Sequence, residues 1–108
     1  MDNVKELPLK NYNNCLACDA FVYINFAPPR LLTDADLATI YYTKNGEEEF
    51  YSQIVDIQRF DFSRMPSLAT LPATGMEAHD WCRWWMTQYP NTQATTEMAV
   101  YYYKKIKQ

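Results

Sequence analysis

The stretch that decides the fold is ATGMEAHDWCRWWMTQYP, residues 73–90, which holds all three tryptophans and the only histidine of the chain. It predicts one clear helix over residues 76–88. Thr74 and Glu77 stand three residues apart, as a capping box requires. The helix should end at Tyr89-Pro90, because the residue before a proline disfavours helical backbone.

The tryptophans of this helix favour one buried face. Trp81 and Trp85 recur at helical spacing, so we expect their rings to pack against one end of a sheet. Trp84 lies beside them, and the alternative for it is an exposed ring that stacks on a base or on a partner side chain. His79 and Arg83 fall on another, polar face.

Four segments rich in β-branched and aromatic residues predict strands. An Asn45-Gly46 pair between the second and third supplies the positive φ of a type I′ hairpin turn. In the third segment, Tyr51, Val55 and Ile57 share one parity, which is typical of a half-buried antiparallel strand. The predicted strands cover residues 20–26, 39–43, 50–57 and 98–106.

The rest of the chain predicts little regular structure. Residues 1–14 are polar and are expected to form a loop or tail, while residues 33–36 form either one helical turn capped by Thr33 or a loop. Residues 59–74 are expected to be a connection with at most one short turn. We therefore predict a single α+β domain over residues 1–108. Its small curved antiparallel-rich sheet, or open β-barrel, would have five or six strands and one main helix.

Composition excludes several classes of function. The chain has 108 residues, of which 48% are hydrophobic, as in a globular domain. Its net charge of −3 argues against binding driven by phosphate neutralisation, although a local basic patch would fit. No apolar run approaches the ~18 residues of a membrane span. Residues 1–6 are mixed in charge and lead into no apolar core, so we expect no secretion signal. We expect a cytoplasmic protein with reduced thiols and no membrane partner.

A second line of inference comes from a family resemblance. Val55-Asp56-Ile57, Thr74-Gly75-Met76, the Trp-rich helix ending in Tyr89-Pro90 and a final aromatic strand together resemble the C-terminal half of ASCH domains of the PUA-like superfamily. Small phage and bacterial members look most similar, and residues 50–103 carry the likeness. The resemblance implies a PUA-like fold and binding of RNA or another nucleic acid.

The chain departs from that family at the ligand site. ASCH domains usually place a Gly-x-Lys-Thr-like turn before an early strand. The matching stretch here, Ala17-Cys18-Asp19-Ala20-Phe21-Val22-Tyr23, has no Lys, Gly or Glu. No catalytic residue can therefore be carried over, and amide hydrolysis of a modified nucleoside ranks third among the functions considered.

Two other constellations are weak. Cys15 and Cys18 form a CxxC motif that could complete a zinc site with His79 and Cys82, but a lone CxxC is more often a pair of reduced thiols. His79 beside Asp80 could suggest acid–base chemistry, yet no nucleophile stands near it in the sequence. We expect no metal, no cofactor and no catalytic residue.

The best functional hypothesis is a non-enzymatic binding module for RNA or another nucleic acid. The expected contacts are Arg83, Trp84, Tyr101, Lys104 and Lys105, which would line one groove if the helix and the last strand lie side by side. The alternative is a protein-interaction accessory protein of phage or mobile-element origin that uses exposed aromatic rings. The oligomeric state is left open.

Overall fold

The computed structural model describes residues 4–7, 18–29, 33–46 and 48–106. The α+β class expected from the sequence is correct, because three helices accompany a five-stranded mixed sheet in this part of the chain. In chain order the elements are β1 (Val4–Glu6), β2 (Ala20–Phe26), α1 (Asp34–Ala38), β3 (Ile40–Asn45), β4 (Glu48–Asp61), a 3-10 turn (Phe62–Arg64), α2 (Ser67–Thr74), α3 (Ala78–Gln88) and β5 (Glu97–Lys105).

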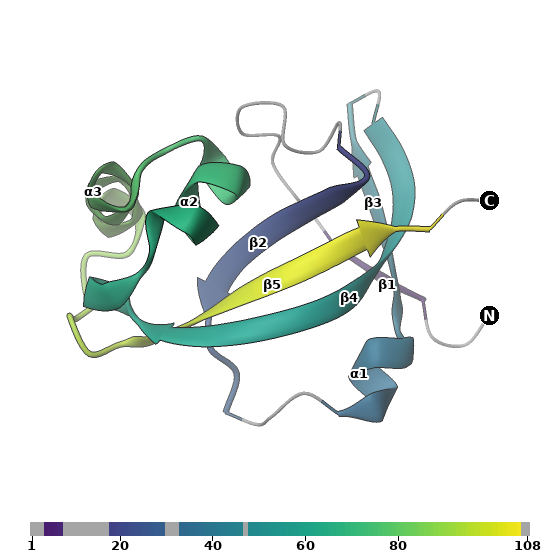
Figure 1. Ribbon diagram of the computed structural model, residues 1–108, viewed down its shortest axis with the longest axis horizontal. Coiled ribbons are helices and arrows are strands. Elements are labelled where there is room, and N and C mark those ends of the chain that lie inside the picture. Colours follow the sequence, from purple (N-terminus) through teal and green to yellow (C-terminus); the bar gives the residue numbers. More distant parts are fainter. Residues whose placement is uncertain (1–3, 8–17, 30–32, 47, 107–108) are drawn as a thin grey trace.

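The sheet is curved and open (Figure 1). Its strand order is β1-β3-β4-β5-β2, so the last strand in the sequence lies between β4 and β2. β1 pairs with β3 in parallel, and the other three pairs are antiparallel. The described strands do not close into a barrel, because β1 and β2 form the two edges. This architecture agrees with the predicted small curved sheet.

The sheet buries a different apolar cluster on each face. Met98 and Val100 of β5 belong to the cluster under the helices, together with Ile24 of β2. Tyr103 of β5 and Phe21 of β2 belong to the opposite cluster, where their rings stack at 5.0 Å. The split follows from the two-residue period of a strand, which points successive side chains to opposite faces.

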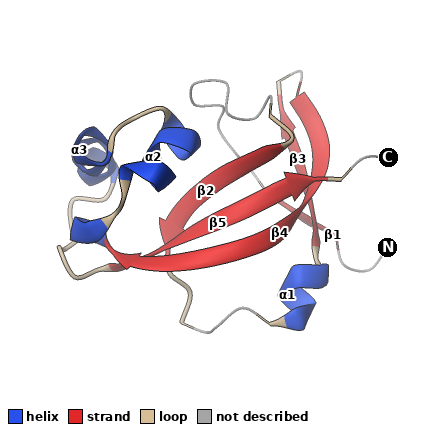
Figure 2. Cartoon of the chain, viewed as in Figure 1, coloured by secondary structure: helices blue, strands red, loops and turns tan. Residues whose placement is uncertain are grey.

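Two helices, α2 and α3, cover one face at one end of the sheet (Figure 2). Trp81 and Trp85 are both buried in that cluster, so the prediction that these rings are core is confirmed. Trp84 is half-buried and packs against the same cluster. The α3 helix also ends where the sequence predicts, with the Tyr89 N–H donating to the carbonyl of Trp85 at 2.9 Å.

The predicted start of this helix is wrong. Thr74 belongs to a separate helix, α2, in the segment that we expected to be a connection. Gly75 closes α2 in the left-handed conformation, at φ 77°, and its N–H donates to the carbonyl of Leu71. No capping box joins Thr74 to Glu77. The N–H of Ala78 is instead satisfied by Ser67 Oγ at 2.9 Å, a contact between the two helices.

The β3–β4 hairpin is confirmed, but β4 is longer and less regular than expected. Asn45 pairs with Glu48 across the turn, and Gly46 has a φ of 63°. A β-bulge between Ile54 and Asp56 breaks the strict alternation. Val55 is consequently 58% exposed, whereas Ile54 is buried, so the predicted inward position of Val55 is wrong.

Two further segments differ in how well they were predicted. The helical alternative for residues 33–36 is correct, because Thr33 Oγ1 accepts from the Asp36 N–H at 3.3 Å and Asp36 Oδ2 accepts from the Thr33 N–H at 2.8 Å. β1 was missed inside the N-terminal segment, of which residues 1–3 and 8–14 lie outside the described part.

Candidate interaction surface

The five residues expected to contact nucleic acid come from two elements. Arg83 and Trp84 belong to α3, whereas Tyr101, Lys104 and Lys105 belong to β5. Arg83 and Lys104 are exposed, and the other three are half-buried. A common groove would require all five to face the same side at the same end of the sheet.

Tyr101 faces the opposite side of the sheet from the helices. Its neighbours in the strand, Val100 and Tyr102, belong to the cluster that packs with α2 and α3. The Tyr101 ring lies instead beside Tyr23 and Tyr103, with centroid distances of 5.9 and 6.3 Å. Tyr101 therefore does not share a surface with the residues of α3.

The two lysines lie at the other end of β5 from α3. Val100 lies under the helices. Because a strand rises about 3.3 Å per residue, Lys104 is about 13 Å further along β5. Lys105 points its Nζ at the ring of Phe50, 4.3 Å from the centroid. The groove predicted between the helix and the last strand is consequently not formed by these five residues.

The residues considered for catalysis or metal binding do not converge either. His79 and Asp80 are exposed on α3. Cys82 packs against the helical cluster, where desolvation raises its thiol pKa, and its Sγ lies 3.8 Å from the carbonyl oxygen of Phe62. Cys18 is exposed, and Cys15 lies outside the described residues. In the described part of the chain, no three His, Cys, Asp or Glu side chains gather as metal ligands would.

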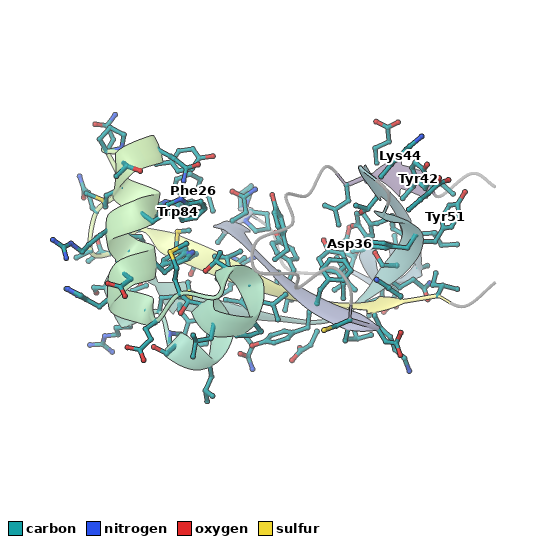
Figure 3. All side chains as sticks on the ribbon, turned by 90° about the horizontal axis from the view of Figure 1, so that it is seen from above. Phe26, Asp36, Tyr42, Lys44, Tyr51 and Trp84 are labelled. Carbon is teal, nitrogen blue, oxygen red and sulfur yellow. The ribbon has the colours of Figure 1, made fainter. Side chains whose placement is uncertain are left out.

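Side chains of the β3–β4 hairpin form a polar aromatic surface at the end of the molecule away from α3. Tyr42 and Tyr51 pair across the strands with ring centroids 5.2 Å apart, and Lys44 stands opposite Glu49 (Figure 3). A hydrogen bond to Glu49 is the main cause that raises the pKa of the Tyr42 hydroxyl. Among the described side chains of this surface, the carboxylates of Glu49 and Glu6 accompany Lys44, so positive charge is not concentrated here.

A second group of exposed aromatic side chains lies at the opposite end, beside α3. We call Phe26, Tyr89 and Met86 the aromatic end patch: these side chains are 38%, 43% and 37% exposed, and Met86 stands three residues before Tyr89 on the same side of α3. The Phe26 ring meets those of Trp85 and Tyr89 edge to face, at 5.2 Å in each case. The ring centroids of Trp85 and Tyr89 lie 4.6 Å apart, so the exposed rings of Phe26 and Tyr89 both pack against the buried ring of Trp85.

Several contacts hold the aromatic end patch in place. Trp85 Nε1 donates to Thr92 Oγ1 at 3.2 Å, which fixes the indole and also uses the buried hydroxyl. The chain after Phe26 is tied to the sheet by Arg59, whose Nη1 donates to the carbonyl of Pro28 at 3.0 Å and to Glu97 Oε1 at 2.6 Å. These hydrogen bonds therefore fix the positions of Trp85 and of the chain segment that follows Phe26.

None of the three residues of this patch is among the contacts predicted from the sequence. The sequence places Phe26 at the end of a predicted strand, and Tyr89 both at the end of the helix and at helical spacing from Trp81 and Trp85. Their proximity depends on how α3 crosses the end of β2, which a one-dimensional pattern does not contain. Figure 3 shows Phe26 and Trp84 at the same end of the molecule, and Trp84 also lies within 6.4 Å of Trp85.

No protein family, curated protein or solved structure matches this chain. The resemblance to ASCH domains therefore remains a prediction. Within the described residues, no helix combines the length and apolar character needed to cross a membrane.

Proposed function

We propose that this chain is a non-enzymatic binding module whose partner is a protein, contacted through the aromatic end patch. The observation that carries the proposal is that the exposed rings of Phe26 and Tyr89 both pack against one buried tryptophan, Trp85. Aromatic residues and Met are enriched at the centres of protein interfaces. Rings that are already packed lose little conformational entropy when a partner covers them, which favours affinity.

Charge supports a protein partner over a nucleic acid. The chain carries a net charge of −3, which repels a polyanion at long range. The cationic residues expected to hold phosphates, Arg83, Lys104 and Lys105, are spread over both ends of the sheet. Binding of RNA, which the ASCH resemblance implies, is the competing proposal. It rests on exposed Arg83 beside half-buried Trp84.

Site-specific photo-crosslinking tests the proposal. A photoreactive phenylalanine at Tyr89 should crosslink a discrete protein in the native host, because this ring lies in the patch. The same group at Val55 is the control, since Val55 is exposed on a bulge of β4, outside the patch. Phe26→Ser should abolish the Tyr89 adduct, with circular dichroism confirming that the variant is folded.

A titration with short RNA and DNA at about 50 mM salt supplies the second arm, because low salt maximises phosphate binding. We expect no saturable binding by the wild type. Salt-sensitive binding that Arg83→Ala weakens would replace the protein partner with a nucleic acid. Identical crosslinks from Tyr89 and Val55 would also overturn the proposal.

A further inference from the structure

The outer edge of β2 has a defined set of outward-pointing backbone groups. The Ala27 N–H donates to the carbonyl of Glu97, and the Lys105 N–H donates to that of Asp19. Both bonds join odd-numbered residues of this segment to β5, with which β2 pairs in continuous register. Because hydrogen-bonded and non-hydrogen-bonded pairs alternate in an antiparallel ladder, the even-numbered residues of β2 point away from β5.

One of these outward groups is already satisfied. The Phe26 N–H donates to the Asn25 side-chain oxygen at 2.8 Å. The three remaining positions are Ala20, Val22 and Ile24, which follow one another along the outer edge at every second residue. In the described part of the chain, no strand pairs with this edge (Figure 1).

The two edges of the sheet are protected very differently. β1 has three residues, two of which are the charged Lys5 and Glu6. Short, charged edges of this kind resist pairing with other chains. β2 has seven residues, AFVYINF, with no charge and no proline, and its register with β5 contains no bulge. Such a strand is a template for pairing.

We propose that β2 pairs antiparallel with β2 of a second copy of this chain, with Val22 on the two-fold axis. In this register Val22 faces its own counterpart, and Ala20 faces Ile24 of the partner subunit. Each of the three residues then exchanges both outward groups across the axis, while Phe26 stays bonded to Asn25. On the other face of the sheet, Phe21 stands opposite Tyr23 of the partner subunit, an aromatic pair of the kind that stabilises strands.

A second copy fits this edge because the set of positions is self-complementary. The register centred on Val22 uses Ala20, Val22 and Ile24 completely and leaves no unpaired group between them. With no charged side chain in β2, the two strands meet without local repulsion. The isologous contact closes on itself as a dimer, as two-fold interfaces do. This pairing does not depend on the aromatic end patch, so either proposal can fail alone.

The dimer should be weak and favoured by salt. One short strand pair covers less than the roughly 800 Å² per partner of a standard stable interface, so dissociation on dilution is expected. Each copy carries a net charge of −3, and screening this repulsion should strengthen association. The salt dependence is therefore opposite to that of nucleic-acid binding.

Sedimentation velocity across a concentration series tests self-association. The weight-average mass should rise from 12.7 kDa towards twice that value, and more readily at about 300 mM than at 50 mM salt. Val22→Pro removes the outward N–H without removing a bond to β5, and we expect at least about a tenfold weaker association. Val22→Ala is the matched control, since it loses the same packing but keeps the N–H.

Disulfide trapping tests the register and does not need the proline variant to fold. In a background with Cys15, Cys18 and Cys82 changed to Ser, Val22→Cys should form a dimer on mild oxidation, because about 5.5 Å between Cα atoms suits a disulfide. Ala20→Cys should not, because the two copies of position 20 lie four residues apart in register. Crosslinking at 20 but not 22, or a wild type that stays monomeric throughout, would overturn the proposal.

Discussion

Replacing Trp81 with Ala gives the most direct test of how the helical layer is held to the sheet. The Trp81 side chain is completely buried and lies against the rings of Phe62 and Trp85, at 5.5 and 5.2 Å. Its indole Nε1, however, has no hydrogen-bond acceptor among the described residues. The ring therefore contributes apolar burial and at the same time carries an unsatisfied polar group.

The expected magnitude follows from these two opposing effects. A tryptophan buries about 150–250 Å², worth roughly 4–6 kcal/mol at about 25 cal/mol per Å². Large-to-small substitutions of buried aromatic residues cost about 3–5 kcal/mol. An unsatisfied buried donor costs about 1–3 kcal/mol, and that cost disappears with the indole. We therefore expect Trp81→Ala to lower the free energy of unfolding by about 3 kcal/mol.

Urea denaturation followed by far-UV circular dichroism measures this change without relying on tryptophan fluorescence. Trp81→Phe should stay within about 1.5 kcal/mol of the wild type, because it keeps an aromatic ring and removes the orphaned N–H. Trp84→Ala, on the same helix but half-buried, should cost less than half as much as Trp81→Ala. A loss below about 1 kcal/mol for Trp81→Ala would refute the reasoning.

Two further substitutions follow from burial. Ile54→Ala should cost about 2–5 kcal/mol and its neighbour Val55→Ala less than about 0.5, because the bulge buries only the former; equal losses in urea melts would place the bulge elsewhere. Burial, followed by the nearby Tyr41, Tyr101 and Tyr23, raises the pKa of Tyr103 above its ordinary value of 10.0. Since the folded state holds this proton more tightly, stability should be unaffected below pH about 10 and fall as the pH rises beyond it. Tyr103→Phe should reduce that fall in urea midpoints measured between pH 9 and 11, and an unchanged slope would contradict the assignment.

Local sequence patterns correctly predict the elements whose residues have a strong intrinsic preference for a strand or a turn. The bounds of β2 follow from AFVYINF and the prolines after it, and the hairpin follows from Asn45-Gly46. α2 was missed because Pro66 and Pro72 were both interpreted as breaks, whereas Pro66 lies at the N-cap, where proline is tolerated, and burial of Ala69 and Ala73 against the sheet supports a helix that contains Pro72. β1 was missed because a segment of only three residues, two of them charged, becomes a strand only through parallel pairing with β3. Contacts with distant parts of the chain therefore determine whether α2 and β1 form.

The candidate surface was harder to predict than the fold. Choosing Tyr101 as a contact beside α3 required knowing which parity of β5 faces the helices, and the run Tyr101-Tyr102-Tyr103 gives no sign of it. Phe26 joins Tyr89 only because α3 crosses the end of β2. Sequence spacing describes neighbours within one element, while both questions concern distances between elements.

The position of β5 has a consequence for how the chain matures. The strand translated last among the five lies between β4 and β2, and β2 has no other strand partner in the described part of the chain. At about 5–20 residues per second, roughly 4–14 seconds separate the synthesis of Phe26 from that of Glu97. During this interval β2, an uncharged strand rich in aromatic residues, has no partner strand to complete its ladder, and its backbone N–H and C=O groups remain available for pairing with other chains.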